Sequence, residues 1–196
     1  MAKIKLTKNE MKKQKDALKR FQRYLPTLML KKQQLQKEIR NVEIKIEDVK
    51  KRIHDMENDI SSWIAVYGED IDLSKYVIVE NIETEEGNIA GVDIPIFNTV
   101  TYKKVDYDLF TTPPWLDRGI EMLKKRISYT MEIRVLEKQA ELLGEELRIT
   151  SQRVNLFEKV MIPQTQSNIK KIAIFLGDQQ TAAVVRGKIS KKKLKR

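Results

Sequence analysis

The feature that most constrains this chain of 196 residues is an apolar seam that recurs in alternating steps of three and four residues. The step can be followed from Met11, and from Leu28 onward only Lys32 interrupts the apolar run. A spacing of 3.5 residues keeps a narrow stripe facing one partner helix while both helices supercoil. The pattern therefore predicts a long coiled-coil helix whose seam contains Leu28, Leu35, Ile39, Val42, Ile46, Val49, Ile53, Met56 and Ile60.

A second seam occupies the last third of the chain. From Ile133 the same step resumes, and its residues include Leu136, Leu143, Leu147, Val154, Phe157 and Met161. The apolar residues before it, from Leu116 to Ile127, follow a different register. We therefore expect the opening turns of the second helix to pack differently from the rest.

Two prolines lie inside the predicted helices. Proline lacks a backbone N–H and its ring clashes with the preceding turn. We expect a kink or short break near Tyr24–Pro26 and a second kink at Pro163. Because the apolar spacing continues past both prolines, each helix is expected to resume with the same face inward.

The middle of the chain has a different character. Gly68-Glu69-Asp70 is typical of a helix end. Residues 77–102 are rich in β-branched side chains on both sides of Glu85-Glu86-Gly87-Asn88, which predicts a β-hairpin turning there. Pro95 is expected at an edge or an end of its second strand. Thr112-Pro113-Pro114 predicts a linker and the start of the second helix.

Together these patterns predict a mainly α fold: a long antiparallel two-helix coiled coil with a small middle segment that contains a β-hairpin. The expected division is an N-terminal helix at 1–67, an acidic middle at 68–115, a C-terminal helix at 116–190 and a fraying basic tail at 191–196.

Charge is distributed unevenly along the chain, whose net charge is +10. Residues 1–67 carry 17 basic and 9 acidic groups, residues 68–117 carry 3 and 11, and residues 118–196 carry 18 and 8. Two basic arms thus flank an acidic middle, which favours two partners with opposite charge requirements over a merely solvated surface.

Catalytic, cofactor and metal sites are not predicted. His54 is the only histidine, and it is interpreted as an ordinary flank residue rather than a member of a catalytic triad. There is no cysteine and no glycine-rich phosphate loop. The acidic pairs Glu69-Asp70 and Glu85-Glu86 are interpreted as solvated turn residues.

Neither nucleic acid nor a bilayer is a favoured partner. The pI near 9.6 would suit phosphate binding, but the arms lack outward aromatic residues for base stacking. No stretch approaches the roughly 20 apolar residues that span a membrane, so direct membrane insertion is not expected.

The segment 150–163 resembles a signature of the D subunit of the vacuolar/archaeal-type rotary ATPase, T-x-x-R-V-N-A-L-E-x-V-x-I-P. The matching residues are Thr150, Arg153, Val154, Asn155, Glu158, Val160, Ile162 and Pro163. The stretch 88–95 is similar to that family's N-I-x-G-V-x-V/I-P segment. Phe157 replaces a usual leucine, and Tyr24-Leu25-Pro26 stands where the family commonly has glycine, so the chain looks like a divergent bacterial member.

The resemblance implies a rotor shaft in the central stalk that couples ATP hydrolysis or synthesis to ion translocation and has no active site of its own. Implied partners are the catalytic ring of A and B subunits, the central-stalk F subunit and a membrane-side socket subunit of the C/d type. The implied location is cytoplasmic, at the inner face of the membrane through the complex. Lys191, Lys192 and Lys193 are candidate contacts with the ring.

Two other functions are compatible with paired helices. A prefoldin-like chaperone or scaffold also joins two helices through β-hairpins, although it would not need the 150–163 motif. A basic coiled coil that binds nucleic acid is the other alternative.

Overall fold

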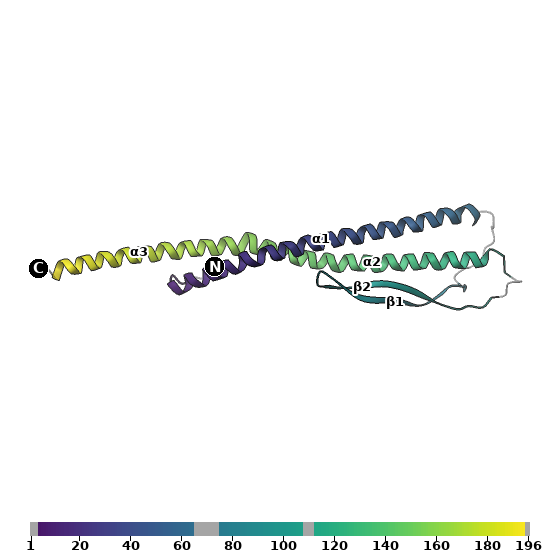
Figure 1. The fold of residues 1–196 in the computed structure, drawn as a ribbon, viewed down its shortest axis with the longest axis horizontal. Helices are drawn as coiled ribbons and strands as arrows, with labels where there is room; N and C mark the ends of the chain where they lie inside the picture. Colours follow the sequence, from purple (N-terminus) through teal and green to yellow (C-terminus); the bar gives the residue numbers. More distant parts are fainter. Residues whose placement is uncertain (1–3, 65–74, 108–111, 195–196) are drawn as a thin grey trace. The chain divides into compact units, whose positions relative to one another are not determined.

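The computed structural model describes residues 4–64, 75–107 and 112–194, and it places side chains for all of these except residues 60–64. The elements follow the order α1 (Lys8–Ile64), β1 (Ile78–Ile89), β2 (Val92–Lys103), α2 (Leu116–Leu156), the π-helical turn η2 (Phe157–Met161) and α3 (Ile162–Leu194). The predicted mainly helical fold with a hairpin in its middle is confirmed (Figure 1).

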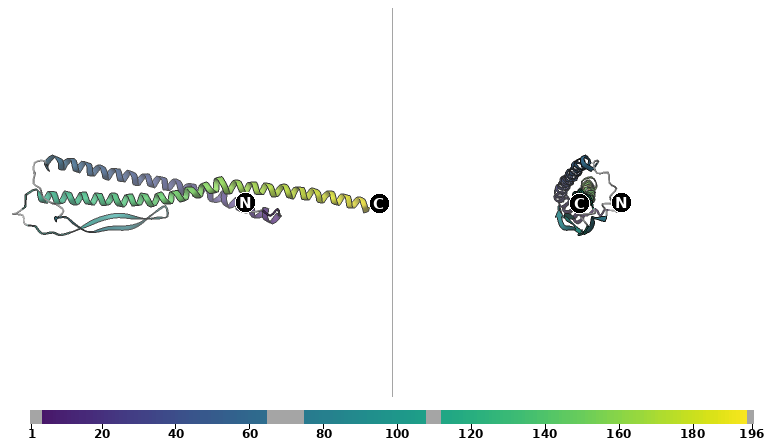
Figure 2. Two further views of the ribbon diagram at one scale, coloured as in Figure 1. Left: turned by 180° about the vertical axis from the view of Figure 1, so that it is seen from behind. Right: turned by 90° about the vertical axis from the view of Figure 1, so that its right-hand side faces the viewer.

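The chain forms two compact units. The first combines Met1–Lys32 with Ile149–Arg196, and the second is Gln33–Arg148. In the second unit α1 runs beside α2, and the hairpin lies along α2, as views from the front and from behind both show (Figures 1 and 2). In the first unit the opening turns of α1 run beside α3.

Thr7 caps the N-terminus of helix α1. The backbone N–H of Glu10 donates to Oγ1 of Thr7 (3.3 Å), and that of Met11 donates to the Thr7 carbonyl (3.0 Å). The threonine hydroxyl thus satisfies a donor that the first turn would otherwise leave open.

The short break considered at Pro26 does not occur, because α1 continues through this residue. Proline costs about 3 kcal/mol in a helix interior. Leu25 and Leu28 on either side stay half-buried, so seam packing over a helix of 57 residues offsets that local cost. The hydroxyl of Thr27 also donates to the Tyr24 carbonyl (2.8 Å).

The irregularity expected at Pro163 appears just before it, as η2. The N–H of Ile162 donates to the Phe157 carbonyl, five residues back. Pro163 cannot donate to the carbonyl of Lys159 and its ring crowds that carbonyl, so a wider turn relieves the clash. Helix α3 continues through residues 191–194, the start of the tail that is expected to fray.

The hairpin turns at a different place from the one predicted. Strands β1 and β2 pair antiparallel from Ile78↔Lys103 to Ile89↔Val92, so the turn residues are Ala90 and Gly91. Their φ angles of 54° and 77° are those of a type I′ turn, and the Gly91 N–H donates to Oδ1 of Asn88 (3.0 Å).

Gly87 is therefore a strand residue rather than a turn residue. A Cβ added there would lie 2.4 Å from Cδ1 of Ile96, so the glycine makes room for that side chain. The neighbouring pair Glu85-Glu86 likewise belongs to β1, where both side chains are exposed. Interruptions of the register between Val79 and Asn81 and between Glu83 and Thr84 add twist to the ribbon.

The main core of the second unit is built by α1, α2 and the hairpin together. Its buried members are Leu35, Val42, Ile46, Val49, Ile94, Leu136 and Leu143. Ile94 is the contribution of β2, with Ile89 and Val92 packed against the cluster from the hairpin end. The hairpin thus covers an apolar edge of the helix pair that two helices alone would leave open.

The opening turns of α2 pack separately, as the shifted register predicted. Leu116 and Ile120 form a second buried cluster with Val77, and Leu123 and Ile127 lie against it. Helix α2 starts just after the predicted linker, where the Leu116 N–H donates to the Pro113 carbonyl (3.0 Å). The predicted helix end at 68–70 lies outside the described residues.

Candidate functional site

The candidate site is the helix pair and the surfaces it presents. In the second unit the predicted seam residues Leu35, Val42, Ile46, Val49, Leu136 and Leu143 are buried, while Ile39, Ile53, Met56 and Leu147 are half-buried. The side chain of Ile60 lies outside the described residues. Arg126 of α2 pairs with Glu57 of α1 (3.0 Å), which ties the flanks of the two helices together.

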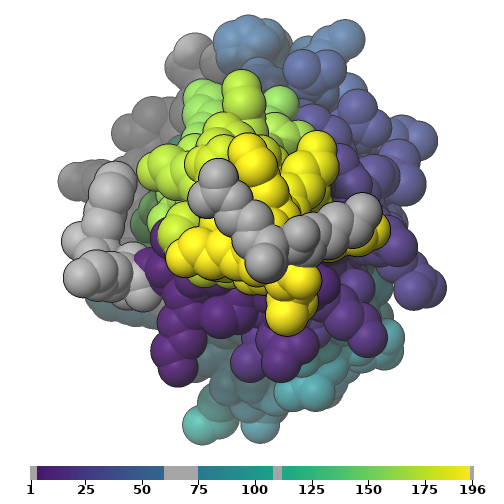
Figure 3. All heavy atoms as spheres, turned by 90° about the vertical axis from the view of Figure 1, so that its left-hand side faces the viewer, coloured from purple at the N-terminus to yellow at the C-terminus, as the bar shows by residue number. Residues whose placement is uncertain are grey.

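In the first unit the seam joins α1 to η2 and α3. The rings of Phe21 and Phe157 lie 5.3 Å apart between centroids, tilted by 43°. Nδ2 of Asn168 donates to Oε1 of Gln14 (3.5 Å), so the contact partners run in opposite directions along the two helices. An end-on view shows the opening residues of α1, in purple, against α3 (Figure 3).

The seam of the first unit also contains polar residues. Thr150 and Thr165 are buried beside the apolar Val154 and Ile172. The hydroxyl of Thr165 donates to the Met161 carbonyl (2.6 Å), which supplies a partner for a carbonyl within the wider turn. Leu28 and Met161 are half-buried in this unit.

The last part of α3 carries no buried side chain. Leu176 is half-buried, and every described residue from 177 to 194 is exposed. Among them are Val184, Val185 and Ile189, with Lys191, Lys192 and Lys193 in the last turn. This stretch is helical, and none of its described side chains is buried.

The segment 150–163 divides into two structural roles. Thr150 and Val154 are buried seam residues. The residues from Asn155 to Pro163 include the π turn, and Arg153, Asn155, Glu158 and Pro163 are exposed while Ile162 is half-buried. The motif therefore encodes both the seam and the change of helical pitch.

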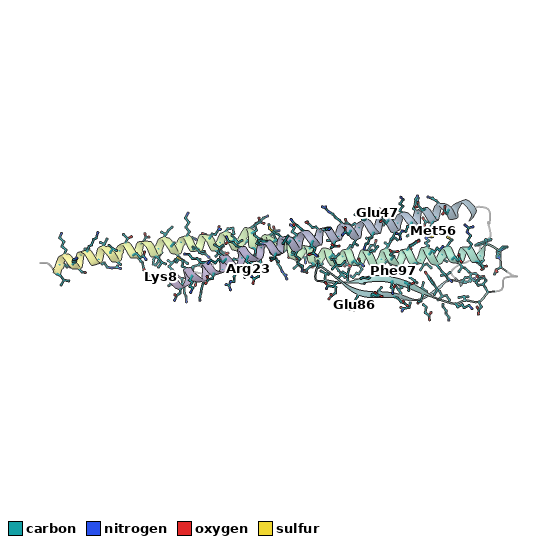
Figure 4. The ribbon with its side chains drawn as sticks, viewed as in Figure 1. Lys8, Arg23, Glu47, Met56, Glu86 and Phe97 are labelled. Carbon is teal, nitrogen blue, oxygen red and sulfur yellow. The ribbon has the colours of Figure 1, made fainter. Side chains whose placement is uncertain are left out.

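The two units of the structure differ more in net charge than the three sequence segments do. The first unit contains 22 basic and 4 acidic side chains, a net charge of +18. The second unit contains 16 basic and 24 acidic side chains, a net charge of −8. Lys8 and Arg23 extend from the first half of α1, and Glu86 extends from the hairpin (Figure 4).

Among the residues that the structure describes, the pKa shifts involve two surface pairs and one partly buried tyrosine. Tyr107 donates its hydroxyl to Asp117, and this hydrogen bond raises the pKa of Tyr107. Burial raises the pKa of Tyr102, whose hydroxyl donates to the Lys124 carbonyl (2.6 Å). The Arg148 side chain donates to Glu145 and lowers the pKa of that carboxyl.

Sequence reasoning missed the polar contacts that attach the hairpin. Nε2 of Gln139 donates to the Pro95 carbonyl (2.6 Å), and Gln139 is buried. Gln139 precedes seam residue Ala140, and the seam pattern carries no signal for a cross-element partner. Pro95 lies within β2. Because the sheet has two strands, β2 is an edge strand, which is one of the two positions expected for Pro95.

Within the described residues, no group of three or more acidic or histidine side chains is arranged to hold a metal ion. His54 is exposed on α1. The pair Glu69-Asp70 lies outside the described residues. No described helix combines the length and hydropathy needed to cross a bilayer.

Comparison with known proteins gives one consistent match. The family model for the D subunit of ATP synthase matches residues 10–192. The D subunit of a V-type ATP synthase from Borreliella burgdorferi is 54% identical over 196 residues, covering 99% of this chain and 96% of the relative. A protein of the same name from Chlamydia pneumoniae is 37% identical, covering 97% of this chain and 93% of the relative.

Proposed function

The chain belongs to the family of ATP synthase D subunits and is a central-stalk component of a rotary V-type ATPase, and we propose that it serves there as the rotor shaft. In this role it couples ATP hydrolysis or synthesis in a catalytic ring of A and B subunits to ion movement through the membrane. It contributes no active site of its own. It works on the cytoplasmic face of the membrane, held there by the complex.

One observation carries the proposal: the exposed stretch of α3 from 177 to 194. Most helical stability in proteins comes from packing of an apolar face against other elements, and this stretch has no buried side chain among the described residues. Its exposed valine and isoleucine side chains and its terminal lysines need a surrounding surface, and the interior of a ring would supply one. In this arrangement Lys191, Lys192 and Lys193 contact the ring.

Charge supports the same orientation. The first unit, with its net charge of +18, would lie within an acidic sleeve formed by the ring. The acidic hairpin unit would face the membrane side, where the F subunit and the C/d-type socket subunit would bind it. Attraction without many directional bonds suits a surface that must slide against its neighbours.

Purification of the tagged chain from its native membranes tests the role. We expect nucleotide-binding subunits to co-purify in more than one copy per shaft, because one shaft serves a whole ring. A preparation that contains nucleic acid instead, or no partner, would contradict the proposal.

A matched pair of substitutions links the role to the helix pair. Ile46→Asp places a carboxylate in the buried seam, so we expect reduced helix content and loss of the chain from the complex. Ile44→Asp is the control, because Ile44 lies two residues away on the same helix and is 60% exposed. Full stability of the Ile46→Asp protein in circular dichroism would show that the pairing scheme is wrong.

A further inference from the structure

Strand β1 of the hairpin has a free edge with open backbone groups. In an antiparallel ribbon, directly opposed pairs alternate between those that exchange two hydrogen bonds and those that exchange none. The pair Ile89↔Val92, which closes the two-residue turn, is of the first kind. Asn88, Glu86 and Thr84 therefore belong to pairs of the second kind, and their N–H and C=O groups point away from β2.

Two hydrogen bonds around the hairpin support this alternation. Pro95, opposite Glu86, has no N–H to give to β1, and its carbonyl accepts from Gln139, so the outer side of β2 faces α2 at this point. Further along β1 the N–H of Ile82 donates to Oδ1 of Asn81 (2.9 Å) rather than to β2. The described residues supply no comparable partner for the outward groups of β1 between the turn and the first interruption of the register.

An acidic groove of about 360 Å³ adjoins this edge. Its lining residues come from both strands: Thr84, Glu85, Glu86, Asp93, Ile94 and Pro95. Glu85 accepts a hydrogen bond from Asn98 (3.3 Å), and Asp93 accepts one from Asn88 (2.7 Å). No described lysine or arginine pairs with any of the three carboxylates. The groove therefore joins unpaired negative charge to an edge that can accept another strand.

We propose that the edge of β1 from Thr84 to Asn88 is extended by a strand of another polypeptide, whose Lys or Arg side chains at alternate positions enter the groove. In such an addition, main-chain hydrogen bonds supply affinity and the side chains on one face supply specificity. Cationic side chains complement Glu85, Glu86 and Asp93. A second copy of this chain is disfavoured, because pairing β1 with itself would bring glutamates against glutamates.

The inference rests on the proposed function, which places this unit outside the ring on the membrane side, and it specifies how one partner binds there. Its test uses the assembled complex. Thr84 is replaced by benzoylphenylalanine, the complex is irradiated, and crosslinked peptides are identified by mass spectrometry. The expected product joins position 84 to a segment with Lys or Arg at alternate positions, from a polypeptide other than the nucleotide-binding subunits.

His54 supplies the control position, because it is exposed on α1 in the same unit. The same probe at position 54 is expected not to give this segment. A crosslink from position 84 to a segment without alternating cations, to a nucleotide-binding subunit, to a second copy of this chain, or to nothing would overturn the inference.

A matched pair of substitutions tests the main-chain contact. Thr84→Pro removes an outward N–H that the pairing with β2 does not use, and Pro95 shows that the hairpin accommodates proline at this kind of position. Thr84→Ala removes the same hydroxyl but keeps the N–H. Relative to Thr84→Ala, the proline variant should retain roughly tenfold less of the crosslinked polypeptide per nucleotide-binding subunit, because a carbonyl of the partner loses its donor. Equal retention by the two variants would refute strand addition.

Charge removal gives an independent measurement that leaves the backbone of the hairpin unchanged. Glu85→Gln with Glu86→Gln should weaken retention of the partner at moderate salt and have less effect at high salt. Glu43→Gln with Asp55→Asn is the control, since both residues are exposed on α1 and the change in net charge is the same. Unchanged retention in the groove variant would overturn the inference. If nucleotide-binding subunits fail to co-purify with the unmodified chain, the proposed function fails instead.

Discussion

Leu143 offers a quantitative test of the helix pair, because its side chain is 0% exposed within the core of the second unit. Leu143→Ala removes three carbon atoms from that core. At about 0.8 kcal/mol per methylene the lost transfer energy is about 2.4 kcal/mol. The cavity left behind raises the total cost to roughly 3 kcal/mol, within the range of about 2–5 kcal/mol found for such changes.

Urea unfolding followed by circular dichroism measures this cost, at several protein concentrations so that any self-association is detected. Ile44→Ala is the control, since a residue that is 60% exposed should change the free energy of unfolding by no more than about 0.5 kcal/mol. The denaturant slope should stay the same in both variants. If Leu143→Ala costs less than about 1 kcal/mol, the core does not hold the helices together as described.

Four further outcomes are expected. Asp117→Asn should lower the pKa of Tyr107 toward its ordinary value of 10.0, so the tyrosine absorbance should change at lower pH in an alkaline titration. Because the pKa of Tyr107 is raised in the folded state, the hydrogen-bonded pair adds stability below pH 10.0. That stability is lost as the pH rises through the raised pKa of the folded state. Ala90→Asn should stabilise the hairpin by about 0.5–1 kcal/mol, because asparagine tolerates the positive φ of this turn, while Gly91→Ala should destabilise it by about 1 kcal/mol, both measured by thermal unfolding. Replacing all three lysines at 191–193 by glutamine should weaken assembly with the catalytic ring at moderate salt and have less effect at high salt, and assembly that is unchanged at every salt concentration would count against an electrostatic contact.

The helical part of the fold could be predicted because its signal is local and repeated. Every heptad places apolar residues on the same face of the helix, so the burial of Leu35, Val42 and Leu143 can be predicted from the spacing alone. The separate packing of Leu116 and Ile120 could also be anticipated, because the register shift is visible in the sequence.

The hairpin turn and the proline positions depend on other physics. The glycine beside two glutamates suggested a turn at Gly87, but the strand continues there because Ile96 occupies the space above the missing side chain. The actual turn uses Ala90, a residue with little preference for positive φ, supported by the side chain of Asn88. At Pro26 the penalty of one residue was outweighed by packing along the helix.

The π turn has a consequence for how chains of this kind can differ in length. In an α-helix one inserted or deleted residue rotates every later side chain by about 100° around the axis, which would take a seam out of its partner's reach. A turn that already holds one extra residue can release it and become α-helical, or keep it. Residues 157–161 are therefore the place where α2 and α3 can tolerate a single-residue deletion, whereas the same deletion near Leu143 would turn the following seam toward solvent.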